Sequence, residues 1–232
     1  LALHLDVLPT PWQWGYVHKA LKISLPIAIQ SALMSGAQVV STIIVAPLGN
    51  VAIAAHSFAI TAESLCYMPG YGIGDAAATL IGQTFGAGRS ALCRSFAHLT
   101  VGLGMSVMAA MGAIMYVFAP EMIALLSPVA DIQALGASVL RIEAFAEPFF
   151  AASIVTYSIC VGAGDTLRPA IMNLASMWCV RLTLAAYLAR DYGLRGVWIA
   201  MAIELTFRGL LFLYRLFRGN WLKELEEKAP AA

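Results

Sequence analysis

The chain has 232 residues, of which 60% are hydrophobic and only 12% are charged, and its mean hydropathy is +0.79. Because a soluble domain is about a quarter charged, a water-soluble globule of this size would lack the charges to cover its surface. The composition argues against a cytosolic enzyme, a disordered chain or a secreted disulfide scaffold, and favours a multi-span membrane protein. The net charge of +1 leaves no basic surplus for binding nucleic acid.

The chain begins at Leu1 without an initiator methionine, and no basic segment followed by an apolar core opens it. We therefore expect a fragment or a processed chain rather than a signal peptide. The cysteines lie in separate segments and form no Cys-x-x-Cys pair, so we interpret them as small packing residues. They are Cys66, Cys93, Cys160 and Cys179.

Six apolar runs are long enough to cross a bilayer as helices, which takes about 20 apolar residues each. In chain order they are Ile23–Ala46, Val51–Phe85, Ala91–Ala119, Ile132–Val161, Pro169–Ala189 and Val197–Phe217. The sequence thus predicts an all-α membrane protein whose one lobe, residues 23–219, is a six-helix transmembrane bundle. We expect residues 1–22 to form an interfacial lead-in and residues 220–232 a cytoplasmic tail.

The distribution of Lys and Arg predicts the orientation of the bundle. With a cytoplasmic amino terminus, the inner segments carry Lys19, Lys22, Arg89, Arg94, Arg168, Arg215, Arg218, Lys223 and Lys228. The outer loops carry only Arg190 and Arg195. Since cytoplasmic loops are rich in Lys and Arg, we expect both termini to be cytoplasmic.

Two of the predicted spans contain residues that disturb helices. Pro69, Gly70, Gly72 and Gly74 lie within the second span, and Pro148 lies within the fourth. Proline removes a backbone donor and glycine loosens a helix, so we expect a hinge at both places, as a kink or as local unwinding. Interrupted helices in lipid indicate a nearby cavity. The alternative is an inert kink buried between helices.

Several ionisable residues fall inside the predicted spans, where a buried charge is costly and often marks a functional site. The acids are Glu63, Asp75, Glu143, Glu147 and Glu204, and the bases are Arg141, Arg181 and Arg208. Asp75 lies toward the cytoplasmic end of its span, which suits a solvated or packing residue equally well.

Three of these acids are candidates for binding a coupling cation. Glu63 lies near the middle of its span. Glu143 and Glu147 are four residues apart, which predicts that they share one helix face, and two carboxylates so close cannot both ionise cheaply. One of them should then hold a proton near neutral pH. Arg181, deep in the fifth span, either takes part in transport or forms a static clamp with Glu147 or Glu63.

The other polar patterns favour structural interpretations. Glu204 and Arg208 are four residues apart, with the acid before the base, and form a possible structural pair. No histidines have the spacing of metal ligands, and no Gly-x-Ser-x-Gly motif is present. We therefore expect no catalytic residue, no metal site and no cofactor, and the chain is not predicted to be an enzyme.

Several motifs follow one another in the order of a known family. The second span carries Ala54-Ala55-His56, Glu63-Ser64-Leu65, Met68-Pro69-Gly70, Gly74 and Ala76-Ala77-Ala78-Thr79-Leu80-Ile81-Gly82-Gln83. Farther along are Gly162-Ala163-Gly164-Asp165-Thr166, Pro169, Trp178 with Arg181-Leu182, and Gly196-Val197-Trp198-Ile199-Ala200-Met201-Ala202. Together these motifs resemble the second half of bacterial multidrug and toxic compound extrusion (MATE) transporters.

The resemblance implies one half, the carboxy-terminal one, of a twelve-helix transporter shaped like an inverted V. Its partners would be the lipid bilayer of the plasma (inner) membrane and the missing amino-terminal six-helix half. The implied activity is antiport, by alternating access, of drugs and other small amphipathic or cationic compounds against H⁺ or Na⁺. Two departures concern the coupling ion. The first span has no acid, and Phe150 stands where some members carry an acid slightly after the position of Glu147.

Two other functions remain open. The chain could be a lipid-linked oligosaccharide flippase of the same superfamily, although such flippases tend to line their cleft with more cations than the three arginines within these spans. It could also be a truncated membrane remnant that transports nothing.

Overall fold

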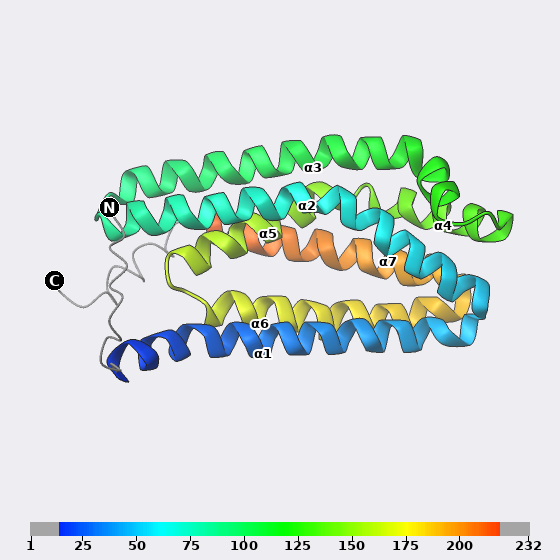
Figure 1. Ribbon diagram of the computed structural model, residues 1–232, viewed down its shortest axis with the longest axis horizontal. Helices are drawn as coiled ribbons and strands as arrows, with labels where there is room; N and C mark the ends of the chain where they lie inside the picture. Colours follow the sequence, from blue (N-terminus) through cyan, green and yellow to red (C-terminus); the bar gives the residue numbers. More distant parts are fainter. Residues whose placement is uncertain (1–13, 219–232) are drawn as a thin grey trace, which may run out of the picture.

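The computed structural model describes residues 14–218, which form an elongated bundle of helices lying along one long axis (Figure 1). No β-strand occurs within this range, so the expected all-helical fold is confirmed. The elements are α1 (Trp14–Val45), the 3₁₀ turn η1 (Ala46–Leu48), α2 (Asn50–Gly86), α3 (Ser90–Leu126), α4 (Ala130–Glu143), α5 (Glu147–Gly162), α6 (Leu167–Ala175), the π-helix η2 (Ser176–Arg181) and α7 (Leu182–Phe217).

Four helical segments of the described chain are long and apolar enough to cross a membrane. They are Ser24–Leu48, Asn50–Gly86, Ser90–Leu126 and Leu167–Phe217, and the bent pair α4–α5 is a fifth candidate. The first three agree with the first three predicted spans. The bent pair covers the fourth predicted span, and the last segment covers the fifth and sixth.

The 51-residue segment Leu167–Phe217 is a helical hairpin rather than one straight rod. Its backbone leaves the helical region at Gly193 (φ 57°, ψ −139°), a positive φ that glycine adopts readily. Figure 1 shows the part before this point lying along α1 and the part after it returning beside α5. The two arms meet so closely that a Cβ on Gly196 would lie 2.2 Å from the Leu188 carbonyl oxygen.

A kink or local unwinding is expected within the second span. The helix α2 is continuous, so the expectation of local unwinding at Pro69, Gly70, Gly72 and Gly74 is wrong. The helix instead changes direction along its course (Figure 1). Close packing explains at least one of these glycines, because a Cβ on Gly70 would lie 2.3 Å from the sulfur of Met108.

The fourth span is broken between Glu143, the last residue of α4, and Glu147, the first residue of α5. The two helices meet at 59°. Pro148 stands in the first turn of α5, where its missing N–H would have no intrahelical partner in any case. The expectation that Glu143 and Glu147 share one helix face is therefore wrong, because they lie on different helices on either side of the break.

The first helix begins earlier than the sequence predicts. It starts at Trp14, within the predicted lead-in, although its membrane-capable part starts at Ser24. The rest of the lead-in and the predicted tail 220–232 lie outside the described residues.

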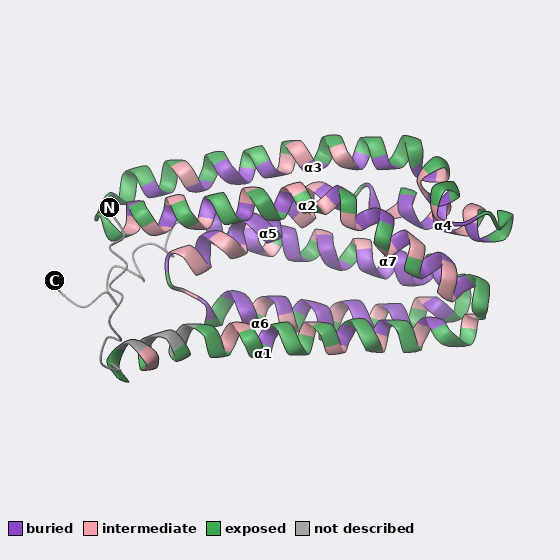
Figure 2. Cartoon of the chain, viewed as in Figure 1, coloured by how far each residue is buried: buried purple, intermediate pink, exposed green. Residues whose placement is uncertain are grey.

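The bundle has a buried central helix, α5, and a largely exposed helix, α1, on one side. Figure 2 shows α5 buried along most of its length and α1 largely exposed. The flanking helix α1 packs mainly on α6 and α7 and hardly touches α2. Its exposed apolar side chains include Leu25, Ile29, Leu33, Val39 and Ile43. Such a flank suits contact with lipid or with a further protein surface.

A substitution at Gly112 of α3 tests how tightly the helices are packed at the break in the fourth span. A Cβ at this position would lie 2.7 Å from the Ala144 carbonyl oxygen and 3.2 Å from the Cβ of Glu147. We expect Gly112→Ala to lower the free energy of unfolding by about 1–3 kcal/mol, because the backbones must move apart. Chemical unfolding in detergent micelles, followed by circular dichroism, measures this loss.

The matched control is Gly102→Ala on the same helix, where a Cβ would meet open space. This variant should be at least as stable as the wild type, since alanine favours a helix over glycine. Equal stability of the two variants would contradict the tight packing at the break.

Candidate functional site

The buried charged residues of the bundle converge from five elements. Within residues 14–218, the buried acids are Glu63 on α2, Glu143 on α4, Glu147 on α5 and Glu204 on α7, and the buried bases are Arg181 on η2 and Arg208 on α7. Four carboxyl groups thus accompany two guanidinium groups. Since unpaired charge is costly in an apolar interior, protons or other cations must neutralise the remaining acids.

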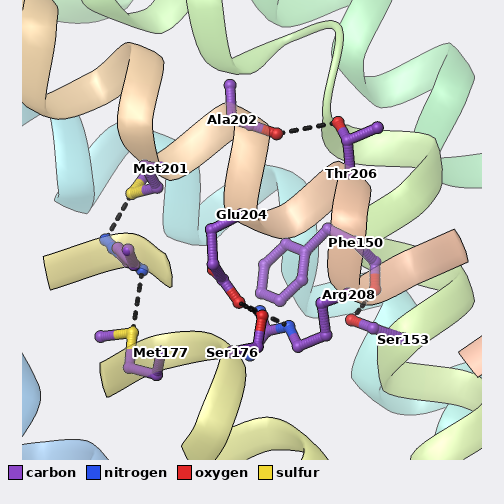
Figure 3. A network of polar contacts seen from close by, with 10 residues as sticks. Phe150, Ser153, Ser176, Met177, Met201, Ala202, Glu204, Thr206 and Arg208 are labelled. Atoms are coloured by element: carbon purple, nitrogen blue, oxygen red, sulfur yellow. Dashed lines mark hydrogen bonds and ion pairs between the residues drawn. The ribbon is translucent and has the colours of Figure 1, made fainter. Parts of the chain in front are cut away.

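Glu204 and Arg208 form a buried ion pair, in which Arg208 Nε lies 3.3 Å from Glu204 Oε1. Figure 3 shows Ser176 reaching the same carboxyl group, to which its hydroxyl donates a hydrogen bond of 2.6 Å. The guanidinium group of Arg208 also lies over the ring of Phe150, 5.6 Å from its centroid. These contacts tie η2 and α5 to α7 and neutralise Glu204.

Glu143 and Glu147 are enclosed at the break in the fourth span, with 1% and 0% of their surfaces exposed. None of their carboxyl oxygens has a hydrogen-bond partner within the described chain. An ionised carboxylate without partners is strongly disfavoured in such surroundings. The chemistry open to these two groups is therefore to carry a proton or to hold a cation.

Glu63 lines a cavity of about 150 Å³ between α1, α2, α5, η2 and α7. Arg181, Arg208 and Phe150 line the same cavity. A larger cavity of about 360 Å³ adjoins it and shares Met34, Tyr71, Phe150 and Arg208 with it. The lining of the larger cavity mixes apolar, hydroxyl and amide side chains with the charged Asp75 and Arg208, and such a mixture of apolar surface and a few polar groups can hold a small organic molecule.

Glu63, Glu143 and Glu147, called the acid cluster below, interact electrostatically with one another. Glu63 acts on both of the other acids, and Glu147 also acts on Glu143. Arg181 attracts Glu63 and Glu143. The structure thus brings together all four sequence-predicted coupling residues, although they come from four different elements.

Arg181 is buried and has weak hydrogen-bond partners. Its Nη1 donates to the sulfur of Met177 at 3.7 Å, and its Nη2 contacts the sulfur of Met201. Its Nε has no partner within the described chain. No ion pair joins Arg181 to Glu147 or Glu63 among residues 14–218.

Two other charges within the predicted spans lie away from this cluster. Arg141 is exposed, and its Nε donates to the carbonyl oxygen of Tyr116 at 3.2 Å. Asp75 is exposed and lines the larger cavity. Within the described chain, no group of three or more His, Cys, Asp or Glu residues is placed to hold a metal ion.

Sequence reasoning missed two hydrogen bonds that join distant helices. The Tyr157 hydroxyl donates to Gln30 Oε1 at 2.8 Å and links α5 to α1 beside the larger cavity. Trp198 Nε1 donates to His56 Nδ1 at 3.1 Å and links α7 to α2. The partners lie 127 and 142 residues apart in the chain, so local spacing gives no sign of them.

A comparison with protein-family models matches residues 26–187 to the MatE family. The chain belongs to the MatE family. Among curated proteins, it is 27% identical over 215 residues to a probable multidrug resistance protein NorM of Thermotoga maritima, with 92% of this chain and 46% of that protein covered. The protein of the same name from Pseudomonas aeruginosa is 30% identical over 197 residues, with 82% and 40% covered.

Solved MATE structures share the fold. An outward-facing multidrug resistance MATE family transporter matches with a TM-score of 0.84 at 20% identity, over 93% of this chain and 49% of that one. The Vibrio cholerae MATE transporter VcmN in its bent form matches with a TM-score of 0.85 at 15% identity and the same coverage. This MatE chain is thus a multi-pass membrane protein, and it spans about half the length of the proteins it matches.

A double-mutant cycle tests the buried ion pair of the MatE chain. We expect Glu204→Leu or Arg208→Met alone to lower the free energy of unfolding by about 3–5 kcal/mol, because each leaves a buried charge unpaired. The double variant should recover most of this loss, since both charges are then gone. Chemical unfolding in micelles measures all three variants.

The matched control is the pair Arg215–Asp165, whose side chains are 18% and 13% exposed. Its coupling energy should be smaller, because water and salt screen exposed charges. Losses at Glu204 and Arg208 that simply add in the double variant would show that the two groups do not stabilise each other.

Proposed function

We propose that this chain is the carboxy-terminal half of a cation-coupled antiporter that exports drugs or other small amphipathic or cationic compounds. The observation that carries the proposal is the surplus of buried carboxyl groups in the acid cluster, beside a cavity lined by Glu63. Membership of the MatE family and the multidrug resistance names of its relatives support the class of substrate. The partial coverage of those relatives supports a missing amino-terminal half as the partner.

The proposed topology has six crossings with both termini in the cytoplasm. Counting α4–α5 as one crossing and the two arms of the Gly193 hairpin as two gives this number. The α2–α3 turn, the α5–α6 turn and the end of α7 lie at the same end of the bundle (Figure 1). These segments carry Arg89, Arg94, Arg168, Arg215 and Arg218, which supports a cytoplasmic location under the positive-inside rule.

The acid cluster supports coupling through its charge. When it is loaded with H⁺ or Na⁺, the cluster is close to neutral and the bundle can seal it from water. When it is empty, its excess negative charge favours a state in which water reaches it. A cation that binds one state better shifts the population toward that state, as alternating access requires. The break ahead of Pro148 is the proposed hinge, because it lies between two members of the cluster.

Transport measurements test the assignment of the coupling acids. The assay uses membrane vesicles that contain the protein, with and without the amino-terminal half of the Thermotoga maritima relative. A fluorescent organic cation reports export driven by a proton gradient or, in a second arm, by a sodium gradient. We expect Glu63→Gln and Glu147→Gln each to reduce export at least about tenfold, because the amide can neither release a proton nor hold a cation as a carboxylate does.

Glu121→Gln is the matched control, since this acid is exposed on α3 and lies outside the cluster. It should transport like the wild type. If the wild type exports the dye and the Glu63 and Glu147 variants export it equally well, the assignment is wrong. If no arrangement exports the dye but a labelled lipid-linked sugar crosses the membrane, the flippase function replaces it.

A further inference from the structure

Arg181 has far fewer hydrogen bonds than its chemistry allows. A guanidinium group has five N–H donors, and a thioether sulfur is a weak acceptor. Arg181 is only 7% exposed, and its hydrogen-bond acceptors within the described chain are the sulfurs of Met177 and Met201. Because its charge is permanent in proteins, this group is held in the interior without a strong anionic partner.

The π-helix η2 sets the direction of Arg181. A π-helix has i→i+5 hydrogen bonds and therefore more residues per turn than an α-helix, so residues five apart point in more similar directions than they do in an α-helix. Ser176 and Arg181 are five residues apart in η2, and the Ser176 hydroxyl donates to Glu204 on α7. Arg181 therefore faces α7 as well, where it meets Met201. In an α-helix, residues three and four apart share a face instead, and the two side chains would diverge.

The cavity beside Arg181 also contains an acid, Glu63, which is a stronger hydrogen-bond acceptor for a guanidinium group than a sulfur is. Arg181 and Glu63 line the same cavity of about 150 Å³. The groups that act electrostatically on Arg181 are Glu204, Glu63, Glu143 and Arg208, and Arg181 also acts on His56. Glu204 already holds an ion pair with Arg208. Glu63 is thus the acid on the cavity wall that is left for the guanidinium group to reach.

We propose that Arg181 is the permanent counter-cation of the acid cluster. While Glu63 is neutral, the guanidinium group of Arg181 contacts the sulfurs of Met177 and Met201. When Glu63 is ionised, the guanidinium group pairs with its carboxylate. The inference rests on the proposed function, in which Glu63 is a coupling acid. It adds a positive group of the protein itself, Arg181, that competes with the proton for Glu63. When the proton leaves Glu63 for water, the guanidinium group of Arg181 pairs with the carboxylate. When a proton returns to Glu63, the guanidinium group leaves it. Arg181 is then a positioning residue that sets the pH at which Glu63 loads.

Carbodiimide labelling of Glu63 tests this inference without measuring transport. Dicyclohexylcarbodiimide attaches to protonated carboxyl groups in apolar surroundings, and mass spectrometry of the full-length protein in liposomes gives the labelled fraction at each pH. We expect Arg181→Met to raise the midpoint pH of labelling by about one unit or more, because an opposite charge near an acid favours its ionised form. Arg181→Lys should restore most of the wild-type midpoint.

Removing a sulfur contact of Arg181 should shift the midpoint pH of labelling in the opposite direction. Met201→Leu conserves volume, so the core should accept it, and it removes one of the two sulfur contacts. The guanidinium group should then favour Glu63, and the labelling midpoint should fall. This variant also decides the matter if Arg181→Met does not fold. Arg141→Met, at an exposed arginine on α4, is the matched control and should leave the midpoint unchanged.

The outcomes separate this inference from the proposed function. Labelling of Glu63 with a midpoint that neither Arg181→Met nor Met201→Leu moves overturns the role of Arg181 and leaves Glu63 as a coupling acid. A midpoint that rises in Met201→Leu also overturns it, because losing the sulfur should favour pairing. Failure to label Glu63 at any pH overturns the role of Arg181 and proton coupling through Glu63, since the acid then never carries a proton, and leaves sodium coupling to the sodium-gradient transport assay.

Discussion

The bundle encloses more carboxyl groups than guanidinium groups in an apolar interior, and the rest of the structure depends on how this excess charge is neutralised. Glu204 is neutralised by Arg208 and held by Ser176. Glu143 and Glu147 have no such partners within the described chain. An interior of this kind is stable when protons or cations occupy it and unstable when they leave. A fold that needs a mobile ion for its own stability can couple the movement of that ion to a change in shape.

The irregular parts of the helices are the places where the charges gather. Glu143 and Glu147 flank the break between α4 and α5, where Gly112 of α3 lets the backbones approach closely. Arg181 ends the π-helix η2, and Gly193 turns the following segment back toward the core. Non-helical backbone is tolerated at membrane depth only where protein or a cavity surrounds it. Here Glu63, Arg181 and Arg208 line the cavity, whereas Glu147 lies at the break, packed against Gly112 of α3.

The sequence predicts the helices and the identity of the buried acids better than their arrangement. Apolar length identifies the spans, and an acid such as Glu63 in the middle of a span stands out by position alone. The shared face predicted for Glu143 and Glu147 fails because the spacing rule assumes one continuous helix, whereas Pro148 follows a sharp break. The partners of Arg181 are equally hidden, because Met201 lies across a hairpin and the π-helix alters the usual spacing. Tertiary packing decides where the two acids lie and which residues Arg181 contacts, and local sequence patterns carry no information about that packing.

The coupling role of the acid cluster requires that it holds protons at neutral pH when no other cation is bound. Infrared spectroscopy of the protein in sodium-free lipid bilayers tests it most directly, because the C=O stretch of a protonated carboxyl group is absent from an ionised one. We expect such a band at neutral pH, smaller in Glu143→Gln and in Glu147→Gln and unchanged in Glu121→Gln. A spectrum without the band, or a band that neither cluster variant reduces, would contradict it.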